Sequence, residues 1–447
     1  MTKTIDYSIK YTLSILAVLS VVLEAGSAGA ELRTYVKEYS YQASKADGEE
    51  SSRTIARREV KKLLLEELAT DLWGITEGGR VQLTKDQIAA LSAGIVKMEV
   101  EDERWHARTY RLRARIEADP GELIKRMEAL LRDREKAKEL ERLRILSDDL
   151  LRENERLRKE FNAATGKKRT SVKAAYDKQT REIRAVDWYE KGFTDINLGK
   201  YDQAVQDLST AIELNPKEAG VYYNRGLAYA ELRQRPQATQ DYSMAIELNP
   251  KFEAAYIHRG FVLFYMGQHD RAIDDFNRAI ALNPKPAAAY VGRGIVNTDR
   301  GNFDQAIRDY NNAIEVAPGF VAAYTNRGLA NYNLGRYDQA LHDFDTVIGM
   351  EPNMTRTYIY RGLANYNLGK YDQAIEDFNT AIKLDPKQAK AYYNRARIHS
   401  LKDNHEKALY DLDAAIKIDQ GFKNMAKKEN DFDRIRERPE FIKLIGP

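Results

Sequence analysis

The amino-acid sequence predicts a mostly α-helical protein: a solenoid of stacked helix pairs, preceded by a small α/β domain and a long charged helix. One observation is a stretch of fourteen residues that occurs at Arg327–Ala340 and again at Arg361–Ala374, with a single Arg/Lys exchange. Another is a set of prolines spaced 34 residues apart: Pro216, Pro250, Pro284, Pro318, Pro352 and Pro386. A catalytic motif is needed once, whereas repetition at a fixed interval indicates a unit that stacks on its neighbours.

The first thirty residues indicate export. Lys3 and Lys10 lie in a short polar stretch that precedes the apolar run Leu13–Leu23. This run has the length of a signal-peptide core and is short for a membrane span of ~20 residues. Ala28–Ala30 fits a signal-peptidase site, so residues 1–30 are expected to be removed, leaving Glu31 first. The predicted location is the periplasm, and the alternative is an uncleaved anchor in the inner membrane.

Composition narrows the function classes. Lys and Arg number 71 and Asp and Glu number 68, which gives a formal net charge of +3. So small a surplus predicts no positive field of the kind that nucleic-acid-binding proteins present, and nucleic acid is not expected as a partner. The absence of cysteine excludes disulfides, thiolate nucleophiles and cysteine-ligated zinc.

Residues 31–118 are expected to form the small α/β domain. Alternation puts Tyr35, Tyr39 and Tyr41 on one face of a strand, and Ser51–Gly74 has apolar residues at helical spacing. The segment Val96–Ala118 then predicts a hairpin; a turn near Trp105 would place Val100 opposite Tyr110. This strand–helix–hairpin order resembles the N-terminal domain of flagellar-assembly T-type envelope proteins.

Residues 119–184 are expected to form the long charged helix and a joint. A heptad repeat begins at Leu140, with Leu140, Ser147, Asn154 and Phe161 at a, and Leu143, Leu150 and Leu157 at d. Asparagine at an a position is typical of two-stranded coiled coils, so one interpretation is a homodimer through residues 140–161. The other is a single helix that spaces two domains. Gly166–Ser171 is interpreted as a solvated basic joint.

Residues 185–422 divide into seven repeats of 34 residues, beginning at residues 185, 219, 253, 287, 321, 355 and 389. Position 4 is always aromatic, position 20 is always Ala, and position 8 is Gly in six repeats and Ala396 in the last. The pattern resembles the tetratricopeptide repeat family, which implies a right-handed superhelix of helix pairs. Small residues at positions 8 and 20 let paired helices approach closely, and proline ends the second helix. Residues 423–447 are expected to cap the last repeat.

Two positions depart from the family pattern in every repeat. Position 7, usually Leu, is Arg in six repeats and Lys191 in the first, and position 23, usually aromatic, is always Asp. Because a lone cation at a packing position would be costly, we expect each position-7 cation to pair with a position-23 Asp. The alternative is a row of arginines that binds an acidic ligand.

The family resemblance implies a concave groove lined by positions 2, 5, 9 and 12 of each first helix. In this chain those positions are mostly apolar or aromatic, and they lack the Lys, Arg and Asn pattern that clamps a peptide carboxylate. The predicted protein-binding residues are Tyr223, Leu227, Ile257, Phe261, Phe264, Val291, Ile295, Leu329, Tyr332, Ile359, Leu363 and Tyr366. The alternative is that these side chains partly pack within the superhelix.

The function expected from these features is that of an exported scaffold or adaptor that binds a protein partner in this groove. The alternative is a self-assembling structural component of the cell envelope that uses the coiled helix and the N-terminal domain. The six histidines show no metal-ligand spacing such as H-E-x-x-H, and no catalytic domain is expected after the cap. We therefore predict no enzymatic activity, no cofactor and no small-molecule substrate.

Overall fold

The computed structural model describes residues 32–76, 83–132, 134–283 and 285–446. These residues fall into two compact units, residues 32–262 and residues 263–446, with the boundary inside helix α9 (Glu253–Tyr265). The predicted signal segment and its cleavage site lie outside the described residues. No helix of the described segments is both long and apolar enough to cross a membrane.

The N-terminal unit begins with a three-stranded antiparallel sheet. Strands β1 (Arg33–Gln42), β2 (Met98–His106) and β3 (Thr109–Ala118) lie in the order β1-β3-β2. The predicted hairpin is present but its predicted register is wrong, because Val100 pairs with Ala114 and not with Tyr110. The turn is at Ala107 and Arg108, both at positive φ, and an irregularity between Val100 and Asp102 shifts the register further.

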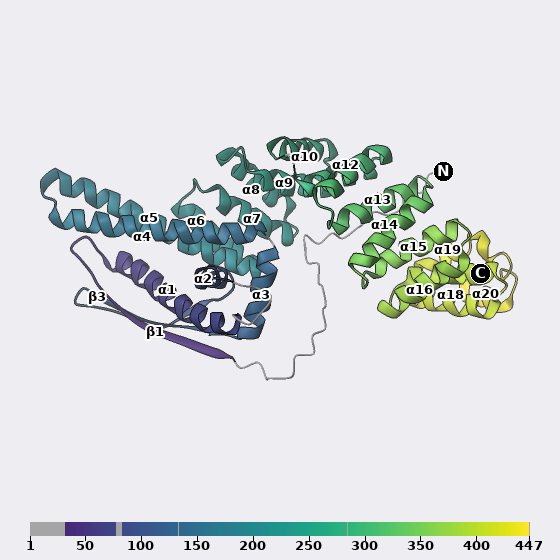
Figure 1. The fold of residues 1–447 in the computed structure, drawn as a ribbon, viewed down its shortest axis with the longest axis horizontal. Helices are drawn as coiled ribbons and strands as arrows, with labels where there is room; N and C mark the ends of the chain where they lie inside the picture. The colour runs from purple at the N-terminus through teal and green to yellow at the C-terminus, as the bar shows by residue number, and fades with distance from the viewer. Residues whose placement is uncertain (1–31, 77–82, 133, 284, 447) are drawn as a thin grey trace. The chain divides into compact units, whose positions relative to one another are not determined.

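Helix α1 (Glu49–Thr76) lies along the sheet, as Figure 1 shows, and α2 (Lys85–Ala93) packs beside it. The predicted apolar stripe of α1 is fully buried: Ala56, Val60, Leu64, Leu68 and Leu72 are each 0% exposed. On β1, Tyr35 and Tyr41 are buried on the same side, as the alternation predicted. The strand–helix–hairpin order is therefore present as expected, with α2 added between helix and hairpin.

Three helices follow the sheet: α3 (Pro120–Arg132), α4 (Arg134–Ala163) and α5 (Gly166–Asn197). Helices α4 and α5 run side by side as a helical hairpin (Figure 1). All seven heptad residues of α4 are buried, and Asn154 Nδ2 donates to Thr180 Oγ1 of α5 at 3.2 Å. The predicted seam is thus covered by the chain itself, which disfavours residues 140–161 as the seam of a homodimer.

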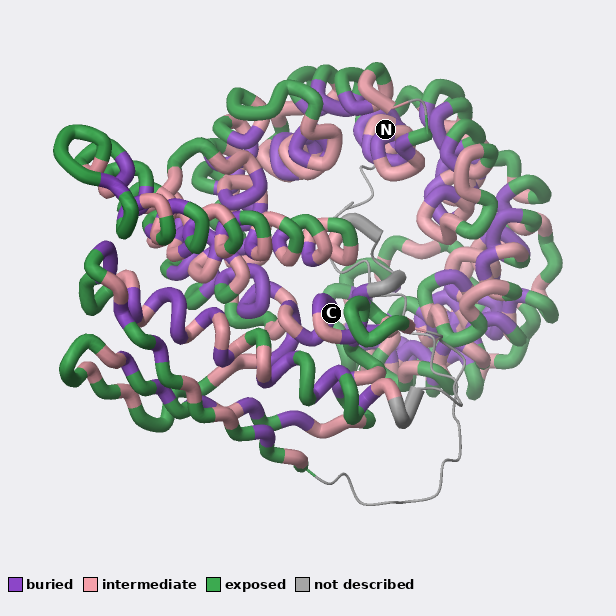
Figure 2. Tube along the Cα trace, turned by 60° about the vertical axis from the view of Figure 1, so that its left-hand side comes forward, coloured by how far each residue is buried: buried purple, intermediate pink, exposed green. Residues whose placement is uncertain are grey.

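Helix pairs form the rest of the chain. The described helices are α6 (Tyr201–Leu214), α7 (Ala219–Glu231), α8 (Arg235–Leu248), α9, α10 (His269–Leu282), α11 (Ala287–Asp299), α12 (Phe303–Val316), α13 (Val321–Asn333), α14 (Tyr337–Met350), α15 (Thr355–Asn367), α16 (Tyr371–Leu384), α17 (Ala389–Leu401), α18 (His405–Ile418), α19 (Gly421–Ala426), the 3₁₀ turn η1 (Asn430–Phe432) and α20 (Pro439–Ile445). The second half of α5 is the first helix of repeat 1. The predicted boundary between residues 184 and 185 therefore lies inside a continuous helix, and Gly166–Ser171 forms the first turns of that helix. Figure 2 shows the buried residues along the inner sides of the helix pairs.

Close helix packing follows from the small residues at position 8. A Cβ added to Gly294 would stand 2.5 Å from Tyr310 Cε1, and one added to Gly328 would stand 2.7 Å from Phe344 Cε1. The position-24 ring therefore occupies the space that a side chain at position 8 would need. After the last repeat, Phe432, Ile435 and Phe441 are fully buried against its helices.

Candidate functional site

In repeats 1, 2 and 4 to 7, the position-7 cation pairs with the position-23 carboxylate of its own repeat. Arg Nη2 lies 2.6 Å from Asp Oδ1 in Arg293–Asp309, Arg327–Asp343 and Arg395–Asp411, and 2.5 Å in Arg361–Asp377. Arg225–Asp241 pairs at 2.8 Å and Lys191–Asp207 at 3.0 Å. Each of these Asp side chains is at most 5% exposed. These ion pairs confirm the prediction that the position-7 cations and the position-23 carboxylates have a structural role.

Each guanidinium also joins its repeat to the preceding one. The Nη1 groups of Arg293, Arg327 and Arg395 donate to an Asn side chain at position 25 of the repeat before, at 2.5–2.6 Å. Arg225 and Arg259 make this contact to a Ser, and Arg361 makes it to Asp345. The arginine of each of these repeats also lies 5.5–5.8 Å from the position-4 ring. These arginines are therefore committed within the array, which disfavours the alternative of an acidic-ligand row.

Two of the four predicted groove residues in the N-terminal unit pack inward. Ile257 is buried, and the Tyr223 ring lies 4.8 Å from the Phe252 ring and 5.9 Å from the Tyr242 ring. Leu227 and Phe261 are half-buried. Position 5 in this unit is therefore a packing position.

The predicted groove residues of the C-terminal unit divide in the same way. Val291 and Ile359 at position 5 are 4% and 5% exposed, so the chain's own packing leaves them little surface for a partner. The Phe264 ring stacks on His269 at 5.5 Å. The remaining predicted residues are half-buried and share the face of positions 9 and 12: Ile295, Leu329, Tyr332, Leu363 and Tyr366.

Segments of the chain itself cover the first repeat's groove positions. Tyr189, Phe193 and Ile196 stand at positions 5, 9 and 12 of repeat 1 and are 1%, 2% and 9% exposed. Phe193 belongs to the core of the α/β domain. Thr194 Oγ1 and Asn197 Nδ2 each donate at 3.1 Å to backbone carbonyls of Ala93 and Gly94 at the end of α2.

Buried charges fix the same contact between the α/β domain and α5. Arg58 of α1 is 6% exposed and pairs with Glu190 at 2.8 Å and with Asp187. Burial raises the pKa of Asp187, against the opposing effect of Arg58. For Glu190, the pull of Arg58 and Lys61 outweighs burial and lowers the pKa. Sequence periodicity could not predict that the α/β domain packs on α5, because periodicity does not show which distant segment contacts a helix face.

The tail after the last repeat covers the other end. Arg397, at position 9 of repeat 7, lies over the Tyr366 ring at 4.5 Å and pairs with Asp431 at 2.8 Å and Glu429 at 3.3 Å. Tyr366 Oη also donates to Asp431 Oδ2 at 2.5 Å, and burial, followed by this bond, raises the pKa of Tyr366. The positive charge of Arg397 at this groove position is therefore neutralised by Glu429 and Asp431 of the chain's own tail.

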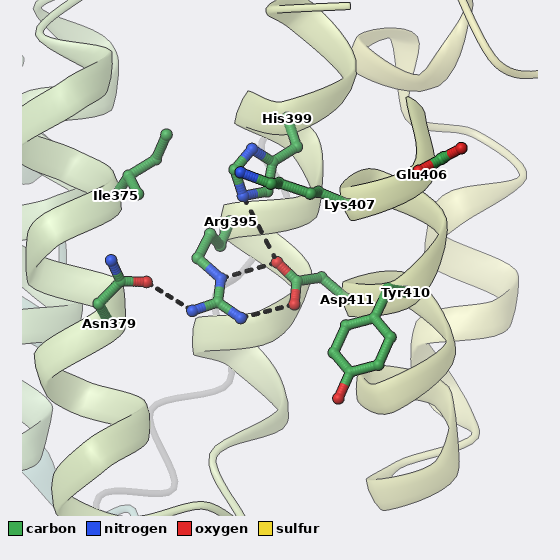
Figure 3. Close-up of a pocket in the computed structure, with 8 residues that line it drawn as sticks. All are labelled: Ile375, Asn379, Arg395, His399, Glu406, Lys407, Tyr410 and Asp411. Atoms are coloured by element: carbon green, nitrogen blue, oxygen red, sulfur yellow. Dashed lines mark hydrogen bonds and ion pairs between the residues drawn. The ribbon is translucent and has the colours of Figure 1, made fainter. Parts of the chain in front are cut away.

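One pocket of about 540 Å³ lies beside the last ion pair. It is lined by residues of α16, α17 and α18, including Arg395, His399, Tyr410 and Asp411 (Figure 3). His399 is buried and its Nε2 lies 3.9 Å from Asp411 Oδ2. Within the described residues, no group of three His, Asp or Glu side chains is placed to hold a metal ion.

Comparisons with known proteins assign the repeats. The family described as TPR repeat matches residues 195–232, 296–335 and 362–403, and tetratricopeptide repeat families match residues 219–252, 254–286, 321–354 and 389–422. A search of curated proteins gave no match.

Solved structures with this architecture align at low overall similarity. YrrB, described as a TPR protein with an unusual peptide-binding site, is 27% identical, with 43% of this chain and 100% of YrrB covered and a TM-score of 0.37. A tetratricopeptide repeat protein from Parabacteroides merdae is 21% identical, with 55% and 98% covered and a TM-score of 0.45. MamA is 24% identical, with 38% and 94% covered and a TM-score of 0.34. From the family matches and the helix-pair array, we conclude that the segment from residue 195 to residue 422 is built of tetratricopeptide repeats.

Proposed function

We propose that this protein is an exported scaffold that binds a segment of a partner protein along positions 9 and 12 of its central repeats. Tetratricopeptide repeats are protein-interaction modules, which supports the scaffold class. Export rests on the signal-like run Leu13–Leu23 and the Ala28–Ala30 site. The proposed location is the periplasm.

One observation carries the choice of surface. The groove positions of repeat 1 are buried by other segments of the chain and Arg397 of repeat 7 is neutralised by the tail, whereas Ile295, Leu329 and Leu363 remain partly exposed. These three aliphatic side chains stand at position 9 of consecutive repeats in the C-terminal unit. Such an apolar row suits the apolar face of a helical or extended partner segment. The residues at the buried centre of that interface would provide most of the binding free energy.

The polar atoms beside this row are already partly engaged. Tyr332 Oη accepts a hydrogen bond from Asn367 Nδ2 at 3.0 Å, and Tyr366 Oη is bonded to Asp431. A partner that buried these hydroxyls would therefore leave few unsatisfied polar groups, which favours apolar contact at this surface.

The test is site-specific photo-crosslinking in the producing cell. A crosslinker at Leu329 and, separately, at Leu363 is expected to capture the same partner, and the double variant Leu329→Arg/Leu363→Arg is expected to abolish capture from a crosslinker at Ile295. The matched control is a crosslinker at Lys383, which is exposed on α16. The proposed binding surface would be wrong if a crosslinker at Lys383 captured as much partner as one at Leu329 or Leu363. It would also be wrong if capture persisted in a folded double-Arg variant.

A further inference from the structure

In repeats 1, 4, 6 and 7, position 11 places a side chain beside the position-23 carboxylate. In repeats 4 and 6 this side chain is an asparagine: Asn297 Nδ2 donates to Asp309 Oδ2 at 3.2 Å, and Asn365 Nδ2 donates to Asp377 Oδ2 at 3.0 Å. In repeat 6, Arg361 takes the other oxygen, Oδ1, at 2.5 Å. The amide therefore completes the hydrogen bonding of a buried carboxylate, and it does so without a charge.

The first repeat has a carboxyl at this position. Asp195 is 0% exposed and interacts with Asp207, which is 2% exposed, at the same spacing of twelve residues. Lys191 and Gln203 both donate to Asp207 Oδ1, at 3.0 and 3.1 Å, while Oδ2 has no hydrogen-bond partner. A carboxyl can replace the asparagine donor at Oδ2 only when it is protonated.

The other charged groups around Asp195 do not reverse this conclusion. Lys97, from the segment between α2 and β2, forms an ion pair with Asp195 and is 34% exposed, so solvent weakens its effect. Burial raises the pKa of Asp195, Lys97 opposes the rise, and Asp207 adds to it. Two lysines, Lys97 and Lys191, therefore favour the charged form of the Asp195–Asp207 pair. Burial and the repulsion between the two carboxylates favour the form in which Asp195 is neutral.

The last repeat has a histidine at this position. His399 is 8% exposed, its Nε2 lies 3.9 Å from Asp411 Oδ2, and its Nδ1 is buried without a hydrogen-bond partner (Figure 3). Arg395 and Lys402 of the same helix region and Lys407 of α18 surround it. Burial lowers the pKa of His399, Asp411 opposes this, and the three cations add to the lowering.

We propose that position 11 makes the two end repeats respond to protons in opposite directions: Asp195 fits repeat 1 while it holds a proton, and His399 fits repeat 7 while it is neutral. The raised pKa of Asp195 gives repeat 1 a stability that is complete below the ordinary Asp range and is lost as pH rises through the folded-state pKa. The lowered pKa of His399 gives repeat 7 a stability that is complete above the ordinary His range and is lost as pH falls through the folded-state pKa.

The test is hydrogen exchange of the full chain between pH 4.5 and pH 8, corrected for intrinsic exchange. Wild-type α5–α6 is expected to open less at pH 4.5 than at pH 8, by up to about tenfold for each unit by which the Asp195 pKa is raised. Asp195→Asn should remove the pH dependence of hydrogen exchange in α5–α6. At every pH, the protection of these helices should equal that of the wild type at pH 4.5. The charge-matched control, Asp202→Asn on the exposed first turn of α6, should keep it.

The reciprocal exchange tests the position and not the residue alone. Asn365→Asp should give α15–α16 the same pH dependence, with Asn297→Asp as the second variant if the first does not fold. His399→Asn should remove the loss of hydrogen-exchange protection that we expect in α17–α18 of the wild type at low pH. The proposal is overturned if wild-type protection of α5–α6 does not fall with pH, if Asp195→Asn weakens it at every pH, or if both reciprocal variants behave as wild type.

Discussion

Replacing Arg293 by Leu would leave Asp309 without its cation, and the structure limits what this costs. The carboxylate is 4% exposed, and Asn297 Nδ2 at 3.2 Å would remain as its bonding partner. Breaking one side of a buried pair costs roughly 3–5 kcal/mol. Because Asn297 would still donate to the carboxylate, we expect a loss in the lower part of this range, about 3–4 kcal/mol.

The assay is a double-mutant cycle by urea unfolding, followed by circular dichroism at pH 7 and pH 5. Asp309→Leu is expected to cost less than Arg293→Leu, because Arg293 is 22% exposed and still donates to Asn277 at 2.6 Å. The double variant Arg293→Leu/Asp309→Leu should recover much of the loss, since no buried charge remains. The loss in Arg293→Leu should also shrink at pH 5, where protonation of Asp309 costs less.

Three outcomes would refute this reasoning. A loss below about 1 kcal/mol would mean that the pair behaves as an exposed surface bridge. A loss that does not change between pH 7 and pH 5 would exclude an uncompensated carboxylate as its cause. A double variant no more stable than Arg293→Leu would assign the loss to packing of the arginine stem against Tyr290.

The remaining predictions concern processing, packing and the cap. Mass spectrometry of the native protein should find Glu31 as the first residue, whereas an intact Met1 would favour the uncleaved anchor. Gly294→Ala should destabilise the array by about 1–3 kcal/mol because the added Cβ would stand 2.5 Å from Tyr310 Cε1, and Gly319→Ala, with open space around its Cα, is the matched control. Phe432→Ala should cost about 3–5 kcal/mol in urea unfolding, because the ring is 0% exposed against the last repeat; a loss comparable to that of the exposed control Met425→Ala would contradict the role of the cap.

The repeat region was predictable because each rule operates within one repeat. The small residue at position 8 and the ring at position 24 are 16 residues apart, and so are the Arg and Asp of each pair, so a 34-residue period contains both pairs completely. For the same reason the heptad of α4 correctly indicated a buried seam. It could not identify the second helix, because periodicity describes one face and says nothing about which chain or segment covers it.

The register of the β2–β3 hairpin and the burial of the position-5 groove residues could not be predicted from these repeating patterns. Ala107 and Arg108 adopt positive φ without the Gly or Asn that usually marks such a turn, so the sequence offered no signal there. The position-5 residues Ile257, Val291 and Ile359 have the composition of a binding surface and the burial of a core. Only the three-dimensional arrangement distinguishes them from position 9.

The position-25 contact of each arginine has a consequence for the length of the array. Arg327 donates to Asn311 in the repeat before it, and Arg361 donates to Asp345 in the same relation. If residues 321–354 were deleted, Arg361 would stand after repeat 4 and meet Asn311, which already serves an arginine in the intact chain. Loss or duplication of such an internal repeat would therefore preserve the position-25 contact, so the number of internal repeats can change in steps of 34 residues without creating a mismatched junction.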